Sequence, residues 1–265
     1  MQQTQRPSFS LPRPGKAVLG VMVAVAAIWI FIASSVNWGK VDPSFLAPFV
    51  GSTTKVLHGQ IWRLVTASLI HEWSGDGAVS HLVTTLFGLY FLAPSLETRW
   101  GAKRTLLFLF GSATFAFVCQ VLLGALIGGN LSQDVWIGGL GMVDAVAVAW
   151  ALQARQGEQI RLMFILPVSP MMLVGFIFLM SVLKVFAVGA HPEGLITPFG
   201  GMLAGYLFAD RSPLRKVWLK LRLRRLQAEN EALRAGAVAR RKAGGPALRV
   251  IHGGAEPPKD KRYLN

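Results

Sequence analysis

The sequence predicts an all-α membrane protein with six transmembrane helices followed by a basic helical tail. Of its 265 residues, 52% are apolar and only 15% are charged, against about 25% charged in a soluble domain. The charge is also uneven, because the segment from Arg211 to Asn265 alone holds 15 Lys or Arg and 4 acidic residues out of a chain with net charge +14. Long uncharged runs fill the rest, so the first 210 residues indicate a membrane domain.

The uncharged runs define the expected spans. The first, Ala17 to Gly39, has 23 residues without a charge, enough to cross about 30 Å of hydrocarbon. Its length favours an uncleaved anchor over a signal peptide. We expect spans over residues 17–39, 77–96, 105–128, 135–154, 163–188 and 194–209. They follow a short tail of residues 1–16 and precede a basic amphipathic helix over 211–243 and a disordered end over 244–265.

The distribution of Lys and Arg in the short loops predicts the orientation of these spans. The N-terminal tail has 3, the segment 96–104 has 3 and the segment 153–161 has 2, whereas the loops around Gly129 and His191 have none. Both termini are therefore expected in the cytoplasm. Short loops and a basic tail fit a bacterial inner membrane, with an organelle membrane left open.

The loop between the first two spans is the first place to look for function. It runs from Val36 to Ser80, and loops of this length without structure of their own tend to be functional or disordered. Trp62 and Arg63 lie in it, where an aromatic belt residue beside a snorkelling cation is as good an interpretation as a functional pair. His71 closes its apolar part, and His81 begins the second span.

Three further groups of residues mark the ends and interiors of spans. Glu97, Arg99 and Gly101 follow the second span, where a local ion pair and a turn glycine are the favoured interpretation. Glycines that open the fourth span either leave backbone amides free to hold an oxyanion or permit close packing; they are Gly138, Gly139 and Gly141. Gly201 and Gly205 form a GxxxG face on the sixth span, so we expect the fourth and sixth spans to touch.

Taken in this order on these spans, the five features resemble the rhomboid intramembrane serine protease family over about residues 60–210. The resemblance implies a six-span rhomboid-like bundle. It also implies a GxSG serine nucleophile on the fourth span, a histidine base on the sixth and an oxyanion-stabilising asparagine on the second. This sequence departs from all three, with Gly141 at the serine position, Pro198 at the histidine position and Thr85 at the asparagine position. Only His81 is kept from that site.

These departures predict a pseudoprotease. Acyl transfer needs a hydroxyl or thiol within hydrogen-bond reach of a proton acceptor, and neither glycine nor proline supplies one. The leading hypothesis is that the protein binds transmembrane helices of client proteins without cutting them, as the resemblance implies for rhomboid pseudoproteases. The alternatives are an intramembrane peptidase that uses non-standard residues and a scaffold that acts through the basic tail.

A second hypothesis is an enzyme with a different chemistry. In it, Asp144 meets His71, His81 and His191 near Glu72 and forms a metal site or an acid–base pair. These histidines lack a tight helical spacing such as HExxH, and an Asp144 that is protonated or bonded to a neighbouring span is the simpler explanation. The only cysteine, Cys119, excludes a CxxC or Cys/His cluster. We expect neither a metal nor a cofactor.

The tail suggests two kinds of partner. Its arginines favour a helix that lies against anionic lipid headgroups; they include Arg215, Arg222, Arg224 and Arg225. A short heptad seam with one asparagine allows weak self-association; its members are Leu219, Leu223, Leu226, Asn230 and Leu233. Few aromatic residues and no RNA-binding motif argue against nucleic acid as a partner.

Overall fold

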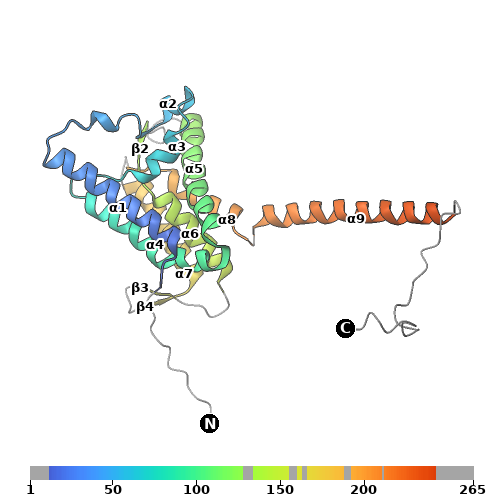
Figure 1. Ribbon diagram of the computed structural model, residues 1–265. Coiled ribbons are helices and arrows are strands. Elements are labelled where there is room, and N and C mark those ends of the chain that lie inside the picture. Colours follow the sequence, from blue (N-terminus) through green and yellow to red (C-terminus); the bar gives the residue numbers. More distant parts are fainter. Residues whose placement is uncertain are drawn as a thin grey trace, which may run out of the picture. The chain divides into compact units, whose positions relative to one another are not determined.

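The computed structural model describes residues 12–127, 134–154, 160–162, 166–187, 192–210 and 212–242 (Figure 1). His191, the expected disordered end over 244–265 and most of the N-terminal tail lie outside these ranges. The chain divides into two units, Met1–Lys216 and Val217–Asn265. We describe each unit by itself.

Three helices of the first unit are long and apolar enough to cross a membrane: α1 (Lys16–Asn37), α4 (Ala78–Trp100) and α5 (Ala102–Ile127). Gly101 separates the last two with φ +78°, a backbone conformation that glycine adopts at little cost. The described residues therefore make an all-α membrane protein, and the expected turn glycine is confirmed.

The remaining helices of this unit are shorter: α6 (Leu140–Gln153), α7 (Pro170–Ala187) and α8 (Thr197–Phe208). At about 1.5 Å per residue, α6 and α8 fall short of a 30 Å core by themselves. These helices are also shorter than the spans expected over 135–154, 163–188 and 194–209. Residues 135–136 form a strand, the described residues before Pro170 form a hairpin, and α8 begins only at Thr197, directly before Pro198, a residue suited to a first helical turn.

α6 lies at the centre of the unit, where it contacts α4, α5, α7 and α8 (Figure 1). All of its residues except Leu140 and Leu152 are buried, as expected of a helix that is apolar on every side. Asp144 is among the buried residues. Polar side chains are expected to meet near the N-terminal ends of α4, α6 and α8.

Small residues bring α6 and α8 into close contact. A Cβ added to Gly201 would lie 2.2 Å from the carbonyl oxygen of Gly141, and one added to Gly205 would lie 2.4 Å from the carbonyl oxygen of Ala145. Only glycine fits at these two positions, because any side chain would push the helices apart. The expected contact between the fourth and sixth spans is confirmed.

The long first loop is folded, with η1 (Pro43–Leu46), β1 (Gly51–Ser52), α2 (Thr53–Leu57), α3 (Arg63–Thr66) and η2 (Ala67–Leu69). β1 pairs antiparallel with β2 (Val135–Trp136), which ties the loop to the segment before α6. Although burial opposes ionisation of Asp134, hydrogen bonds from Thr54 and Ser52 hold its pKa below the usual 3.8. A second hairpin joins β3 (Ile160–Leu162) to β4 (Leu166–Val168).

The second unit contains most of α9 (Pro213–Lys242), in the range where the basic helix is expected. Its side chains from Val217 to Ala239 are exposed. The Arg222 guanidinium lies 5.3 Å from the centre of the Trp218 ring, a cation–π contact within the helix.

Candidate functional site

The two positions expected to carry a nucleophile and a base lie in the first turns of α6 and α8. Gly141 faces α5 and α8, where an added Cβ would lie 2.9 Å from Ala116 Cβ and 3.0 Å from Thr197 Cγ2. Pro198 follows Thr197 at the start of α8. The space for a side chain at position 141 is therefore filled by neighbouring helices, and neither position offers a group that transfers a proton.

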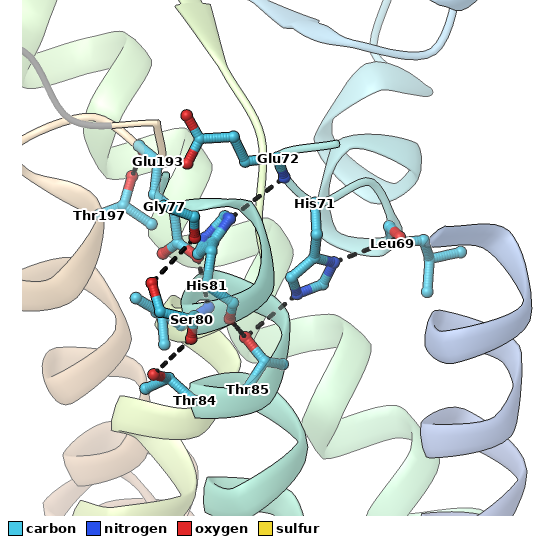
Figure 2. Close-up of polar contacts among 11 residues, drawn as sticks. Leu69, His71, Glu72, Gly77, Ser80, His81, Thr84, Thr85, Glu193 and Thr197 are labelled. Atoms are coloured by element: carbon cyan, nitrogen blue, oxygen red, sulfur yellow. Dashed lines mark hydrogen bonds and ion pairs between the residues drawn. The ribbon is translucent and has the colours of Figure 1, made fainter. Parts of the chain in front are cut away.

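A polar cluster occupies the adjoining space, where α4, α6 and the segment before α8 meet. Figure 2 shows His71, His81, Thr85 and Glu193 converging there. All four side chains are buried, and those of His71 and Glu193 have no exposed surface at all. Buried polar side chains are costly unless they are hydrogen-bonded, so their contacts define the site.

Glu193 is the centre of this cluster. Its Oε1 accepts hydrogen bonds from the Leu140 backbone N–H at 2.7 Å and from His81 Nε2 at 3.0 Å. The other nitrogen of His81, Nδ1, accepts from the Glu72 backbone N–H at 3.2 Å. Since a backbone N–H can only donate, Nδ1 carries the lone pair and the proton of His81 is on Nε2.

His71 packs beside His81, with ring centres 5.0 Å apart. Its Nε2 lies 3.1 Å from Thr85 Oγ1. Burial, and then the neighbouring His81, lower the pKa of His71 from its usual 6.5 to about 4, because both disfavour the charged imidazolium. His71 is therefore neutral at physiological pH.

The glycines before α6 are required by this cluster. Gly138 has φ +124°, and a Cβ there would lie 2.1 Å from Glu193 Oε1 and 2.6 Å from His81 Nε2. A Cβ on Gly139 would lie 3.0 Å from Thr85 Cγ2. Gly138 lets the backbone approach the cluster, and the amide that contacts Glu193 belongs to Leu140, the residue after these two glycines.

Sequence reasoning missed Glu193. It is the only acidic residue in the short segment between Ala187 and α8, and an isolated carboxylate in an otherwise apolar, neutral loop is a signal that could have found it. Its partners His81 and Leu140 are 112 and 53 residues away in the chain, so no local motif connects them.

Asp144 lies deeper on α6, buried, with Glu193 and Lys184 as charged neighbours. In the described parts of the chain, no three His, Cys, Asp or Glu side chains are placed to hold a metal ion. Glu72 approaches His81 through its backbone rather than its carboxylate, and His191 is outside the described residues. The described residues therefore supply no donor set for a metal.

Trp62 and Arg63 hold the first loop together. The Arg63 guanidinium is buried and donates to the carbonyl oxygens of Ala47 and Val50. Trp62 is half exposed and donates from Nε1 to the Pro48 carbonyl. The interpretation of Arg63 as a snorkelling cation was wrong, because its charge is satisfied by loop carbonyls and not by water.

Glu97 and Arg99 connect helix ends at the opposite end of the unit. The Glu97 carboxylate accepts from the backbone N–H groups of Ala17 and Val18 at 2.9 and 3.0 Å, in the first turn of α1. Arg99 donates to the carbonyl of Gln153, the last residue of α6. Each charge therefore meets a helix end of opposite partial charge, a long-range role that the sequence did not indicate.

A rhomboid-domain family model matches residues 58–211, more than half of the chain. The chain belongs to the rhomboid family. No curated protein matched the chain in a sequence comparison. The family match covers the folded loop from α3 onward, the glycine-opened α6 and the GxxxG face of α8, and it ends at residue 211, five residues before the first unit ends at Lys216.

The rhomboid domain has an apolar groove among its described pockets. It has a volume of about 550 Å³ and lies between α6, α7 and α8. Its lining is almost wholly apolar and includes Val148, Met171, Val174, Phe178, Phe199 and Leu203. In a bilayer a lining of this kind packs against apolar groups, because Tyr206 is the one residue among those that line the groove with a polar side chain.

Proposed function

We propose that this rhomboid-family membrane protein is proteolytically inactive and binds transmembrane helices of client proteins. The observation that carries the proposal is the packing at Gly141, where Ala116 and Thr197 occupy the space that a nucleophile would need. Pro198, at the position expected for the base, has no side-chain group that accepts a proton. Without a nucleophile, the oxyanion-type donors that persist nearby have no covalent intermediate to stabilise.

Client binding is supported by the apolar groove between α6, α7 and α8. Several of its residues are exposed in the described chain, among them Met171, Phe178 and Leu203. A transmembrane helix associates through van der Waals packing against such a surface. The six-span arrangement is part of the same proposal and is supported by the uncharged runs. The Lys and Arg distribution supports both termini in the cytoplasm, and the short loops and basic tail support a bacterial inner membrane.

The catalytic half of the proposal is tested with purified protein in lipid vesicles and a mixture of fluorescent single-span substrates. We expect no cleavage product and no covalent labelling by a fluorophosphonate probe. An active serine rhomboid in parallel vesicles controls for substrate quality. Site-dependent cleavage that survives further purification would contradict inactivity and favour the alternative of a peptidase with non-standard residues.

The binding half is tested by placing a photo-crosslinking amino acid at Leu203, in the groove. Leu107 on α5 is more exposed, at 67% against 45% for Leu203, and lies outside the groove, so it is a stringent control position. We expect crosslinks to single-span membrane proteins from Leu203 and few from Leu107. Equal crosslinking from the two positions would contradict a specific docking surface.

The tail is proposed to bind anionic lipid headgroups. The side chains of Arg222, Arg224 and Arg225 are exposed on α9, and each basic residue near an anionic surface contributes about 1 kcal/mol. Self-association through Leu219, Leu223, Leu226 and Leu233, all of them exposed, is the competing use of the same helix.

A further inference from the structure

The folded first loop contains a cavity that neither the polar cluster nor the apolar groove includes. It has a volume of about 220 Å³ and is lined by residues of η1, β1, α2 and α3 and of the segment at the start of β2. Its rim is open, because Pro43, Ala47, Lys55 and Asp134 are exposed. Pockets for drug-sized ligands measure about 300–1,000 Å³, so this cavity fits a smaller group.

One wall of the cavity is apolar and is held in place by the core. Leu46, Val50 and Trp73 line it, and they pack in the same hydrophobic cluster as Ile32 of α1. The Trp73 carbonyl oxygen also accepts a hydrogen bond from Asn37 Nδ2 at 2.9 Å. Packing against a long helix therefore fixes the shape of the cavity, and a preformed cavity binds a ligand with little cost of ordering.

The loop carbonyls use only part of the Arg63 guanidinium. The residue is 3% exposed, and its Nε and Nη1 donate to Gln60 and to two backbone carbonyls. In the described part of the chain its Nη2 has no hydrogen-bond partner. The fully buried side-chain atoms without a partner there are Gln153 Nε2 and Glu193 Oε2, so Arg63 Nη2 keeps exposed surface. Because Arg63 lines the cavity, two N–H groups that share its positive charge are available to a ligand.

Two further charges lie at the rim. Asp134 is already satisfied, because its carboxylate accepts hydrogen bonds from the Thr54 backbone N–H and the Ser52 hydroxyl. The charge of Lys55 favours the ionised form of Asp134, but among the described residues its Nζ makes no hydrogen bond or ion pair. Two positive charges and one negative charge leave the lining with a net charge of +1, and the charged groups without a partner are donors.

The surface beside the cavity is apolar. Phe49, Ile61 and Trp62 are exposed in the same loop. In a membrane protein, exposed aromatic side chains beside cations are typical of the interface at which phospholipid headgroups lie. A phosphate group is therefore an anion that this loop would meet.

We propose that this cavity binds a phosphate diester, with Arg63 Nη2 and Lys55 Nζ as donors to its oxygens and with Trp73 packed against its small organic body. A diester carries one negative charge, which matches the net charge of the lining, and both donor types bind phosphate. The donors come from separate elements, so a tetrahedral group, whose oxygens point in different directions, suits them better than a planar carboxylate. This site does not depend on client binding.

The same group occurs in phospholipid headgroups and in soluble diesters, and two probes distinguish these sources. Glycerophosphoglycerol is the soluble diester, and dihexanoyl phosphatidylglycerol carries the same headgroup on short acyl chains. Each is added to the full chain in neutral detergent, at constant ionic strength set with sodium chloride. A ligand that binds only the folded state raises the unfolding temperature. We expect a saturable rise. A response to both probes shows that the headgroup suffices, and a response to the lipid alone assigns the site to lipid.

Three variants locate the binding. Lys55→Gln removes one exposed donor and should weaken the apparent affinity about tenfold, the effect of losing one hydrogen bond to a charged group. Ala47→Leu narrows the cavity, keeps both cations and should abolish the response. Lys40→Gln is the matched control, because Lys40 is an exposed cation of the same loop outside the cavity, and it should respond as wild type does. Arg63 is left unchanged because its hydrogen bonds hold the loop together.

The outcomes decide the proposal in either direction. Wild type that shows no saturable response to either probe would overturn it. So would a response that Lys55→Gln and Ala47→Leu leave unchanged, because the probe would then bind elsewhere, as on the basic tail. A rise with sodium acetate equal to that with glycerophosphoglycerol would overturn the assignment to phosphate. Since Lys55 and Lys40 are exposed, this comparison does not depend on a change in the core, and its failure would leave the crosslinking test at Leu203 unaffected.

Discussion

Position 141 shows how a single glycine decides both packing and chemistry. It lies where α5, α6 and α8 meet, and its neighbours leave no room for a Cβ. Gly201 packs directly against its carbonyl oxygen. The same atoms that pack α6 against α8 therefore leave no space for a nucleophilic side chain at this position. Glu193 shows the complementary case, in which an acidic side chain fills the space beside positions 141 and 198.

Restoring a serine is expected to fail. Gly141→Ser, alone or with Pro198→His, should show no fluorophosphonate labelling, because the new side chain meets Ala116 and Thr197 and the nearby donors are already bound to Glu193. Overpacking of this kind costs about 1–3 kcal/mol, so the unfolding temperature should also fall. Gly111→Ser on α5, where an added Cβ meets nothing within 4 Å, is the control. Labelling of the double variant would show that the space opens more readily than its packing indicates.

His71 is expected to make the domain sensitive to acid. Its pKa is about 4 in the folded state and 6.5 in its usual environment, so between these values the unfolded state binds more protons. Its contribution to stability is fully present above pH 6.5 and is lost as the pH falls toward 4. At 1.36 kcal/mol per unit the full effect is on the order of 3 kcal/mol.

The measurement is the unfolding temperature of the detergent-solubilised chain between pH 7.5 and about 4.5, a range chosen to cross the ordinary histidine pKa. His71→Asn keeps a polar side chain without a titrating group and should flatten the slope. His58, which is exposed, gives the control His58→Asn with an unchanged slope. A slope as steep in His71→Asn as in wild type would assign the acid sensitivity to other groups.

At the scale of elements, helix ends are joined by side chains from distant helices. Glu97, from the last turn of α4, bonds two N–H groups in the first turn of α1, and Arg99 bonds the end of α6. These contacts neutralise partial charges that a bilayer cannot solvate. The motif is thus a connector between helices.

Removing the Glu97 carboxylate should loosen α1. Glu97→Ala leaves both N–H groups without their acceptor, and loss of a side-chain cap costs about 0.5–2 kcal/mol. Glu97→Gln keeps one acceptor oxygen and should lose less. The unfolding temperature should fall in the order wild type, Gln, Ala; a midpoint for Glu97→Ala equal to wild type would show that the cap contributes nothing.

At the scale of the whole molecule, the rhomboid-family match ends at residue 211 and the first unit ends at Lys216. Near this end, Asp210 bonds Trp100 and Arg104 and pairs with Arg215. Our proposal assigns the exposed arginines of α9 to a separate interaction with anionic lipid.

This assignment predicts protection of the tail in anionic bilayers. Chymotrypsin should cut near Trp218 and the neighbouring leucines more slowly in nanodiscs with anionic lipid than in zwitterionic ones. Replacing Arg222, Arg224 and Arg225 by Gln should remove about 3 kcal/mol of attraction and the protection with it. Protection that is independent of lipid charge but grows with protein concentration would favour the leucine seam instead.

Hydropathy and small-residue spacing were enough to predict a membrane protein, six spans that include the three long apolar helices, and the contact between the Gly141 and Gly201 helices. The resemblance to the rhomboid family came from the order of short motifs along the chain. Hydropathy, spacing and motif order can all be read along a chain. Helix bounds near residues 135 and 163 were missed, because uncharged strands and loops have the same composition as spans.

What only the tertiary structure decided is where distant polar groups meet. The burial of Arg63, the role of Glu97 at α1 and the placement of Glu193 against His81 and Leu140 each join residues tens of positions apart. A hydrogen bond depends on a separation in space of about 3 Å, and sequence distance carries no record of it. The chain by itself therefore determined which residues stand at positions 141 and 198, and only the fold decided which distant side chains surround them.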